Sequence, residues 1–596
     1  MIHYDVLIIG SGFGGSVSAL RLSEKGYKVG VLEAGRRFED KDFAKNSWHL
    51  KDFLWAPQIG CFGIQRIHLL NNVMILAGAG VGGGSLNYAN TLYKPGESYF
   101  KDRQWADITD WEDELTPYYE QAQKMLGVVE NPTMTNADKV SKRVAEEMGV
   151  GHTFRMAPVG VFFGEKVGLE GKPRETVPDP YFGGAGPDRT ACHECGECMT
   201  GCRHNAKNTL LKNYLYLAEN AGTEVHDLTT VTTIKRKGDK WEVETVPTET
   251  IGKSVLKRVT GKKKAGRKTF TSDYIVMAAG TWGTQKLLHT QRLKGNLQNF
   301  PDSLGKMTRT NSEALLGAQE KAYNPDCDFS EGVAITSSYY PAPDTHIEPV
   351  RYGKGSNAMA LLQTLMTDGD KIQPRWLEFI KQVGLQYKMI PRIALLSKWS
   401  QRTVINLVMQ TRDNSLTTHL GKLGPFTILR SRQGTGDPNP NWIPEGNEAT
   451  RRLASLMTDG LAGGVWSEVF DIPLTAHFLG GCPIGANAEK GVVDGYNRVW
   501  GYPTMFITDG SSIAANPGVN PSLSITAGAE RSAAMWPNKG EEDKRPDQSE
   551  GYIRIDPIEP KNPAVPPSAP AALRLPLTPV NGNKANSDKI ENTFGE

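Results

Sequence analysis

The pattern of apolar positions near the N-terminus changes its period twice. A continuous apolar run over 6–9 is followed by pairs of apolar residues three apart between 17 and 22, and then by a second run over 28–32. Continuous runs are typical of strands buried on both faces, and a spacing of three is typical of a helix. Residues 4–35 therefore predict a strand, a helix and a second, parallel strand.

Strand-like patterns return later in the chain. Residues 224–234 are rich in β-branched side chains and residues 241–246 alternate, so both segments predict strands. The apolar run 274–280 is followed by a turn and a helix, which suits a parallel strand returning to the first sheet. From about residue 308 the chain changes to short strand-like pieces such as 332–340, which indicate a second domain.

The first strand and helix are joined by glycines in the spacing G-x-G-x-x-G, at Gly10, Gly12 and Gly15, and Glu33 ends the second strand. Such glycines let the turn and the helix N-terminus approach a pyrophosphate, whose charge the helix dipole favours. A carboxylate at the position of Glu33 can accept a hydrogen bond from a ribose hydroxyl. The unit predicts a dinucleotide site, because a glycine-rich turn in an unrelated sheet would leave Glu33 unexplained.

A second glycine-rich stretch, VMILAGAGVGGGSLNYAN, covers 73–90. A backbone with so few side chains can lie flat against a planar or phosphorylated group and offer it amide donors. A flexible surface loop is the alternative, but these glycines are embedded in apolar residues. The candidate contacts are Gly82, Gly83, Gly84, Ser85 and Asn87.

Near the C-terminus, His477 lies in TAHFLGGCPIG, and a strand over 505–508 leads to the turn Asp509–Gly510. Asn520 and Pro521 precede a segment with helical spacing, 522–534. A single histidine is most often structural. A helix that begins at Pro521, however, directs its amides and positive dipole at an anion.

Four of the seven cysteines fall within eleven residues as C-x2-C-x2-C-x3-C: Cys192, Cys195, Cys198 and Cys202. The spacing matches a bacterial ferredoxin run, whose thiolates bind an iron–sulfur cluster. Two features differ from that run, since Arg203 and not proline follows Cys202, and no second run exists. Zinc ligation, reduced structural thiols and a local disulfide stay open as alternatives.

Composition narrows the class of protein. A charge of +2 over 596 residues, with 39% hydrophobic and 22% charged residues, fits a soluble globular protein without a nucleic-acid partner. The basic stretch 252–268 is expected to be a solvated hairpin tip, because no aromatic residues interleave it. The chain begins in its first strand and has no membrane-spanning run, so a cytoplasmic location is the default, with export by another route open.

Residues 373–401 form an amphipathic segment in which Trp376, Phe379, Ile380 and Val383 share a helical face beside several basic residues. One hypothesis is peripheral contact with a membrane surface. The ordinary alternative is a helix that covers the substrate pocket.

The GSGFGG motif with Glu33, the loop GAGVGGGSLNYAN, the stretch around His477 and the segment 502–534 together resemble the glucose–methanol–choline (GMC) oxidoreductases, most strongly their cholesterol oxidase branch. The resemblance extends to about residue 537. It implies a noncovalent FAD in a doubly wound, Rossmann-like α/β domain, with a second, α+β domain over the flavin.

This resemblance predicts a discontinuous domain organisation. The FAD-binding domain would comprise 1–100, 205–307 and 467–537, and the substrate domain 101–204 and 308–466, including the cysteine cluster. The Pro-rich segment 538–596 is predicted to be a disordered tail.

The resemblance also implies roles for single residues. His477 and Asn520 would face the flavin and the substrate hydroxyl, Asp509 and Gly510 would support the flavin side chain, and Val231 would contact the adenine. Glu348, in THIEPVRYG, matches a strand that points a catalytic glutamate at a steroid.

The implied reaction is oxidation of a sterol 3β-hydroxyl to the ketone by hydride transfer to flavin, with oxygen as acceptor and with Δ5 to Δ4 isomerisation as a second step. Two alternatives remain. One is a dehydrogenase of another bulky alcohol, and the other is an electron-transfer flavoprotein. In both, a cysteine-ligated cluster would pass electrons to a redox acceptor protein.

Overall fold

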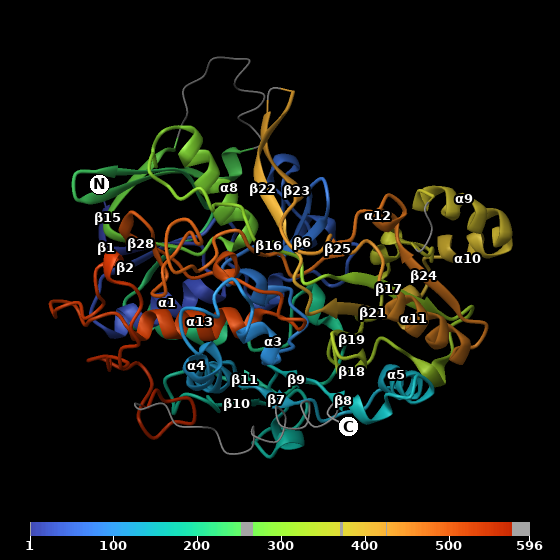
Figure 1. Cartoon of the computed structure of the whole chain (residues 1–596). Helices are drawn as coiled ribbons and strands as arrows, with labels where there is room; N and C mark the ends of the chain where they lie inside the picture. The colour runs from blue at the N-terminus through green and yellow to red at the C-terminus, as the bar shows by residue number, and fades with distance from the viewer. Residues whose placement is uncertain (1, 252–265, 370–372, 425, 575–596) are drawn as a thin grey trace.

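Two large sheets organise the molecule, one on each side of the view in Figure 1. The computed structural model describes residues 2–251, 266–369, 373–424 and 426–574. Most of the basic stretch 252–268 therefore lies outside the described residues. Within these ranges, no helix is long and apolar enough to cross a bilayer.

The first sheet is parallel at its centre, in the order β12-β2-β1-β15-β28. Val6 pairs with both Val29 and Tyr274, and Ile275 pairs with Met505. The strand predicted over 274–280 is thus confirmed as a parallel member of this sheet. The strands are β1 (Ile2–Ile9), β2 (Val29–Leu32), β12 (Glu224–His226), β15 (Lys268–Met277) and β28 (Tyr502–Ile507).

The prediction of a single strand over 224–234 was wrong. The chain turns at Leu228, which has a positive φ of 45°, and forms two strands. β12 continues the parallel sheet beside β2, whereas β13 (Thr229–Lys237) pairs antiparallel with β14 (Lys240–Pro247).

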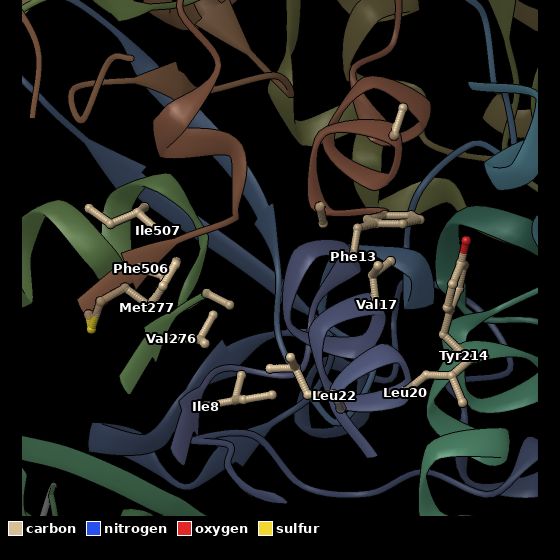
Figure 2. Close-up of a cluster of buried hydrophobic side chains, with 14 of the residues drawn as sticks. Ile8, Phe13, Val17, Leu20, Leu22, Tyr214, Val276, Met277, Phe506 and Ile507 are labelled. Carbon is tan, nitrogen blue, oxygen red and sulfur yellow. The ribbon is translucent and has the colours of Figure 1, made fainter. Parts of the chain in front are cut away.

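α1 (Phe13–Glu24) packs against this sheet, and α13 (Ser522–Ala534) packs against α1. Figure 2 shows Leu22 of α1 beside Ile8 of β1, with Phe13 and Val17 of α1 close to each other, in the core. The helices are also joined by a buried ion pair, in which Arg21 donates two hydrogen bonds of 2.8 Å to Glu530. α4 (Trp111–Leu126) packs on the other side of α13.

The second sheet has the order β20-β24-β17-β21-β19-β18-β8, and its pairings are antiparallel. α5 (Asn136–Glu147) and α11 (Pro444–Leu456) pack on it. The predicted class, a doubly wound α/β domain with a second α+β domain, is confirmed. The strands are β8 (Arg155–Met156), β17 (Ala314–Gln319), β18 (Ser337–Ala342), β19 (Thr345–Val350), β20 (Gln363–Leu365), β21 (Thr403–Gln410) and β24 (Leu461–Val465).

Two small sheets lie between the large ones. In one, β25 (Leu474–Thr475) pairs with β6 (Met74–Gly78), which pairs with β5 (Gln65–Leu69). In the other, β26 (Leu479–Gly480) pairs with β16 (Thr308–Arg309). The short segment between β25 and β26 is therefore held at both ends, and it carries His477.

The prediction of a disordered tail was wrong for 538–574. Val565 and Ala569 are buried in the core of the first domain. The backbone N–H of Asn562 donates to the carbonyl of Glu24 (3.0 Å), and that of Ala571 donates to the carbonyl of Tyr181 (3.1 Å). The alanines and valine of this Pro-rich segment supply small apolar side chains that fit the surface of the domain, whereas 575–596 lie outside the described residues.

The tight contact between α1 and β28 makes a testable prediction. A Cβ at Gly14 would lie 1.9 Å from the carbonyl oxygen of Thr508, so Gly14→Ala should destabilise the protein by roughly 1–3 kcal/mol or more. Gly528, in α13, has open space where its Cβ would be, and Gly528→Ala is the matched control. Urea unfolding measures both, and equal stabilities would contradict the packing argument.

Candidate active site

A cavity of about 730 Å³ begins at the carboxyl ends of β1 and β15 and extends to the second sheet. Ile9 and Ala278 line the first end, and Leu316, Ile405 and Val465 line the second. The carboxyl ends of parallel strands are the usual site of nucleotide binding in such sheets. The cavity thus joins the predicted nucleotide site to an apolar compartment.

Glycine residues, which leave the backbone uncovered, form the end of the cavity at β1 and β15. Gly10 has a φ of +102°, and a Cβ there would lie 2.2 Å from the carbonyl oxygen of Ala278. A Cβ on Gly83 would lie 2.7 Å from the Cα of Gly12, so the two predicted glycine loops touch each other. A Cβ at Gly12 itself would meet nothing within 4 Å. The two loops together form a surface that a flat group can approach closely.

Glu33 lines this end and is held by protein donors. Its Oε2 accepts hydrogen bonds from the backbone N–H (3.0 Å) and the hydroxyl (2.8 Å) of Ser11, and its Oε1 accepts from the N–H of Gly35 (2.7 Å). These bonds fix the carboxylate at the end of β2, beside the glycine loop.

Most of the predicted cofactor residues line the cavity: Gly10, Gly12, Glu33, Gly83, Gly84, Asn87, Val231, Asp509 and Gly510. Three do not. Gly15 allows α1 to pack on Gly10, because a Cβ would lie 2.1 Å from that residue's carbonyl oxygen. Gly82, with a φ of +102°, and Ser85 shape the second loop, in which the Ser85 hydroxyl donates to the Gly82 carbonyl (2.8 Å).

Basic residues at the cavity were not predicted. Arg66, on β5, and Lys286, on α8 (Gly280–Leu293), both line it. Burial lowers the pKa of both side chains, which favours an anionic group beside them. Neither lies in a motif, so the sequence carries no signal for them.

His477 is oriented by a carboxylate that sequence reasoning missed. Its Nδ1 is hydrogen-bonded to Glu313, which also accepts a hydrogen bond from the backbone N–H of Ala476 (2.6 Å). Because Nδ1–H donates to this carboxylate, Nε2 of the neutral ring is left as an acceptor toward the cavity. Glu313 precedes β17 and is separated from His477 by 164 residues, so no local motif reveals it.

Asn520 lies between His477 and Glu348. Its Nδ2 is 3.4 Å from Nε2 of His477 and donates to Oε2 of Glu348 (3.3 Å). The Oδ1 of Asn520 and the Oε1 of Glu348 are buried and have no partner among the described residues. Unpartnered buried acceptors are costly, so the Oδ1 of Asn520, which lines the cavity, fits a ligand that donates a hydrogen bond.

Glu348 is fully buried on β19 and does not itself line the cavity. Burial raises the pKa of its carboxyl to about 8, and the hydrogen bond from Asn520 opposes that rise. The structure thus brings the three predicted catalytic residues together from three separate elements.

The four clustered cysteines line a second, small cavity and are free thiols. The local disulfide that their spacing left open is therefore not formed. Met199, next to Cys198, reaches the wall of the large cavity.

The chain was compared with known proteins. The model of a GMC oxidoreductase family matches residues 468–529, and that of an FAD binding domain matches 5–42. A cholesterol oxidase of Mycobacterium tuberculosis is 61% identical over 97% of this chain and 99% of its own length. A cholesterol oxidase of Acinetobacter baumannii is 42% identical over 90% of this chain and 95% of its own.

The chain belongs to the GMC oxidoreductase family. It is accordingly an FAD-dependent alcohol oxidoreductase, as predicted. Solved structures share the fold of this GMC oxidoreductase at low identity. Pyridoxine 4-oxidase from Mesorbium loti has a TM-score of 0.54 at 15% identity and covers 89% of this chain and 98% of its own. A formate oxidase from Aspergillus oryzae has a TM-score of 0.54 at 14% identity, and it covers 89% of this chain and 97% of its own.

The residues of this GMC oxidoreductase fit FAD. The touching glycine loops, the cations Arg66 and Lys286 and the carboxylate of Glu33 supply close backbone, positive charge and a hydroxyl acceptor at one end. Asn520 supplies an unpartnered acceptor at the other end. When bound, FAD supplies the hydride acceptor of the reaction.

The burial of Glu348 predicts a pH effect on stability. Its unfolded pKa is near 4.5 and its folded pKa is about 8, so its contribution is fully present below pH 4.5 and is lost as the pH rises through 8. Between these values the unfolding free energy should fall by about 1.4 kcal/mol per pH unit more in the wild type than in Glu348→Gln. Urea unfolding at pH 5 to 8 measures the slopes, with the exposed Glu170→Gln as control, and identical slopes in wild type and Glu348→Gln would refute the shift.

Proposed function

We propose that this GMC oxidoreductase oxidises the 3β-hydroxyl of a sterol to the ketone, with oxygen as electron acceptor. The observation that carries the proposal is the joining of the Glu313–His477–Asn520 array to a large apolar compartment within one cavity. The relatives named cholesterol oxidase span the whole chain and support the same substrate class.

In this reaction the hydroxyl proton of the substrate must leave as the carbinol carbon is oxidised. Nε2 of His477 is the acceptor, because Glu313 holds the proton on Nδ1 and stabilises the imidazolium that forms. Asn520 orients the substrate oxygen beside this ring. The apolar walls contributed by β17, β21 and β24 exclude water and bind the ring system of the sterol.

A second step, isomerisation of the Δ5 double bond to Δ4, is proposed for Glu348. The ketone makes the protons at C4 acidic, and the carboxylate of Glu348 takes one from C4 and returns it at C6. A pKa of about 8 suits a group that must both accept and release a proton near neutral pH. The 3.3 Å bond from Asn520 holds this carboxylate beside the same substrate site.

Peripheral contact with a membrane is proposed for the segment around α9 (Arg375–Leu385). A surface helix normally buries its apolar side chains, but α9 does the opposite. Arg375 and Glu378 are buried, whereas Trp376 and Ile380 are 43% and 57% exposed. Arg375 donates hydrogen bonds to the carbonyl of Thr367, which anchors the helix by its polar side.

The apolar face of α9 is part of a larger exposed surface. Its other members come from α9, from the segment that follows it and from α12 (Trp466–Val469) with the residue after it: Leu377, Leu385, Tyr387, Ile390, Trp466 and Phe470. α9 and α10 (Ile390–Ala394) contact β20, whose first residue, Gln363, lines the cavity. Lys381 and Lys388 lie in the same segment, so the surface combines apolar and basic groups as interfacial helices do.

Two variants separate the proposed steps. His477→Gln should keep its bound flavin but lose about 100-fold or more of its turnover, because the proton acceptor is gone. Glu348→Gln should still form the ketone but release it unconjugated. Peroxide production with cholesterol in air and the absorbance of the conjugated enone measure the two steps, with the exposed His152→Gln as control. Wild-type rates in His477→Gln would refute its role, and no peroxide from wild type would refute the oxidase assignment.

The membrane contact is tested with the double variant Trp376→Asp/Ile380→Asp. Wild type should sediment with vesicles of mixed zwitterionic and anionic phospholipid at low salt, and the double variant should not. Leu293→Asp, at a residue 68% exposed on α8 and remote from α9 in Figure 1, is the matched control. Turnover of detergent-solubilised cholesterol should be unchanged in both. If the wild type does not bind the vesicles at low salt, the proposed membrane contact is wrong.

A further inference from the structure

A second site lies where residues 192–204 fold around the small cavity. Its walls include all four clustered cysteines, His193 and His204. The chain bends sharply here, since Glu194 and Gly196 both have positive φ angles, of 59° and 74°. The backbone N–H of Glu194 donates to Sγ of Cys192 (3.3 Å). Such N–H to sulfur bonds surround thiolate ligands and tune the metals that they hold.

Three cations are buried around these thiols. Lys207 lines the small cavity, is 1% exposed and donates only to the carbonyls of Leu86, Tyr88 and Cys198, at 2.8–3.0 Å. Arg189 and Arg351 are equally buried and donate to carbonyl, amide and hydroxyl oxygens.

Among the residues that the structure describes, none of these three cations has a carboxylate within 4 Å. Arg351 lies directly behind the cavity, because a Cβ on the lining residue Gly332 would be 2.0 Å from its Nη1. Arg189 lies within electrostatic range of Cys202.

The carboxylates of Asp138 and Glu194 lie within electrostatic range of Arg351, whereas the ionisable groups near Lys207 are the thiols of Cys198 and Cys202. Buried charges are normally paired, so the environment of Lys207 is completed by a negatively charged group at these thiols.

The spacing of the donors excludes one zinc ion held by the four thiolates. Tetrahedral zinc with bonds of about 2.3 Å needs all its donors within about 4 Å of one another. In the described part of the chain, the metal-capable donors that approach within 4.8 Å of one another in a group of three are those of His193, Cys195 and His204. Among the described residues, no such group of three includes two of the four thiols. A four-iron core does not bring its thiolates together in this way, because each iron takes one thiolate.

Charge decides between these arrangements. Zinc held by two neutral imidazoles and one thiolate would carry a net positive charge and add to the three buried cations. Four thiolates around a four-iron core carry a net charge of roughly −2, which the cations offset. We propose that Cys192, Cys195, Cys198 and Cys202 ligate one iron–sulfur cluster of the four-iron class, with Lys207, Arg189 and Arg351 compensating its charge.

This site lies close to the large cavity. Met199 directly follows the ligand Cys198 and lines the large cavity. Lys207 also holds the carbonyls of Leu86 and Tyr88, at the end of the second glycine loop. The same buried ammonium thus contacts the cluster loop and the loop that approaches the flavin site.

The experiment is metal and sulfide analysis of the full chain purified without oxygen, before and after treatment with ferrous iron and sulfide. We expect about four irons and four acid-labile sulfides per chain, and a low-temperature electron paramagnetic resonance signal after reduction with dithionite. Cys198→Ser should lower the iron content at least about tenfold, whereas Cys327→Ser, at a half-buried cysteine outside the cluster, should keep it.

Lys207→Met tests the electrostatic role of this lysine through the reduction potential of the cluster, which a purely structural role would leave unchanged. Loss of the positive charge should shift the cluster's reduction potential to more negative values. FAD content and sterol turnover of the same samples report on the flavin reaction separately. Stoichiometric zinc in place of iron, no iron after treatment with iron and sulfide, or full iron in Cys198→Ser would each overturn the proposal.

Discussion

The structure depends on the close approach of three backbone segments at the carboxyl end of the parallel sheet. Gly10 lies against Ala278 at the end of β15, and Gly14 lies against Thr508 at the end of β28, each with no room for a Cβ. This contact sets the floor of the cofactor site. It also fixes where Asp509 begins the segment that leads through Asn520 into α13, so the cofactor site and the side-chain amide of Asn520 are positioned by one packing constraint.

At the other end of the cavity, a short polar array is embedded in apolar surroundings. Glu313, His477, Asn520 and Glu348 form one line of hydrogen bonds, and each member constrains the next. Burial strengthens these bonds and also makes unpartnered acceptors costly, which is why the unpartnered Oδ1 of Asn520 at the cavity is informative. A site that leaves one acceptor open inside apolar walls is suited to a large apolar substrate with one hydroxyl.

Two further features lie near the cavity, the exposed apolar surface around α9 and the loop that carries the four clustered cysteines. Helix α9 places apolar side chains outward and contacts β20, whose Gln363 lines the far end of the cavity. The cysteine loop lies against the wall near the glycine loops. The proposed membrane contact and the proposed cluster thus lie at different walls of the same cavity.

The local motifs of the sequence determined the parallel strands, the glycine loops, Glu33 and the helix after Asn520, because close backbone approach and helical periodicity depend on neighbouring residues. Tertiary structure decided what depends on distant ones. Glu313 meets His477 across 164 residues, and Arg66 and Lys286 reach the cavity from unrelated elements. Periodicity identified an apolar face on α9, but only packing showed that it points outward. The Pro-rich composition of 538–574 predicted disorder, yet its small side chains pack in the core, since burial depends on the surface that receives them.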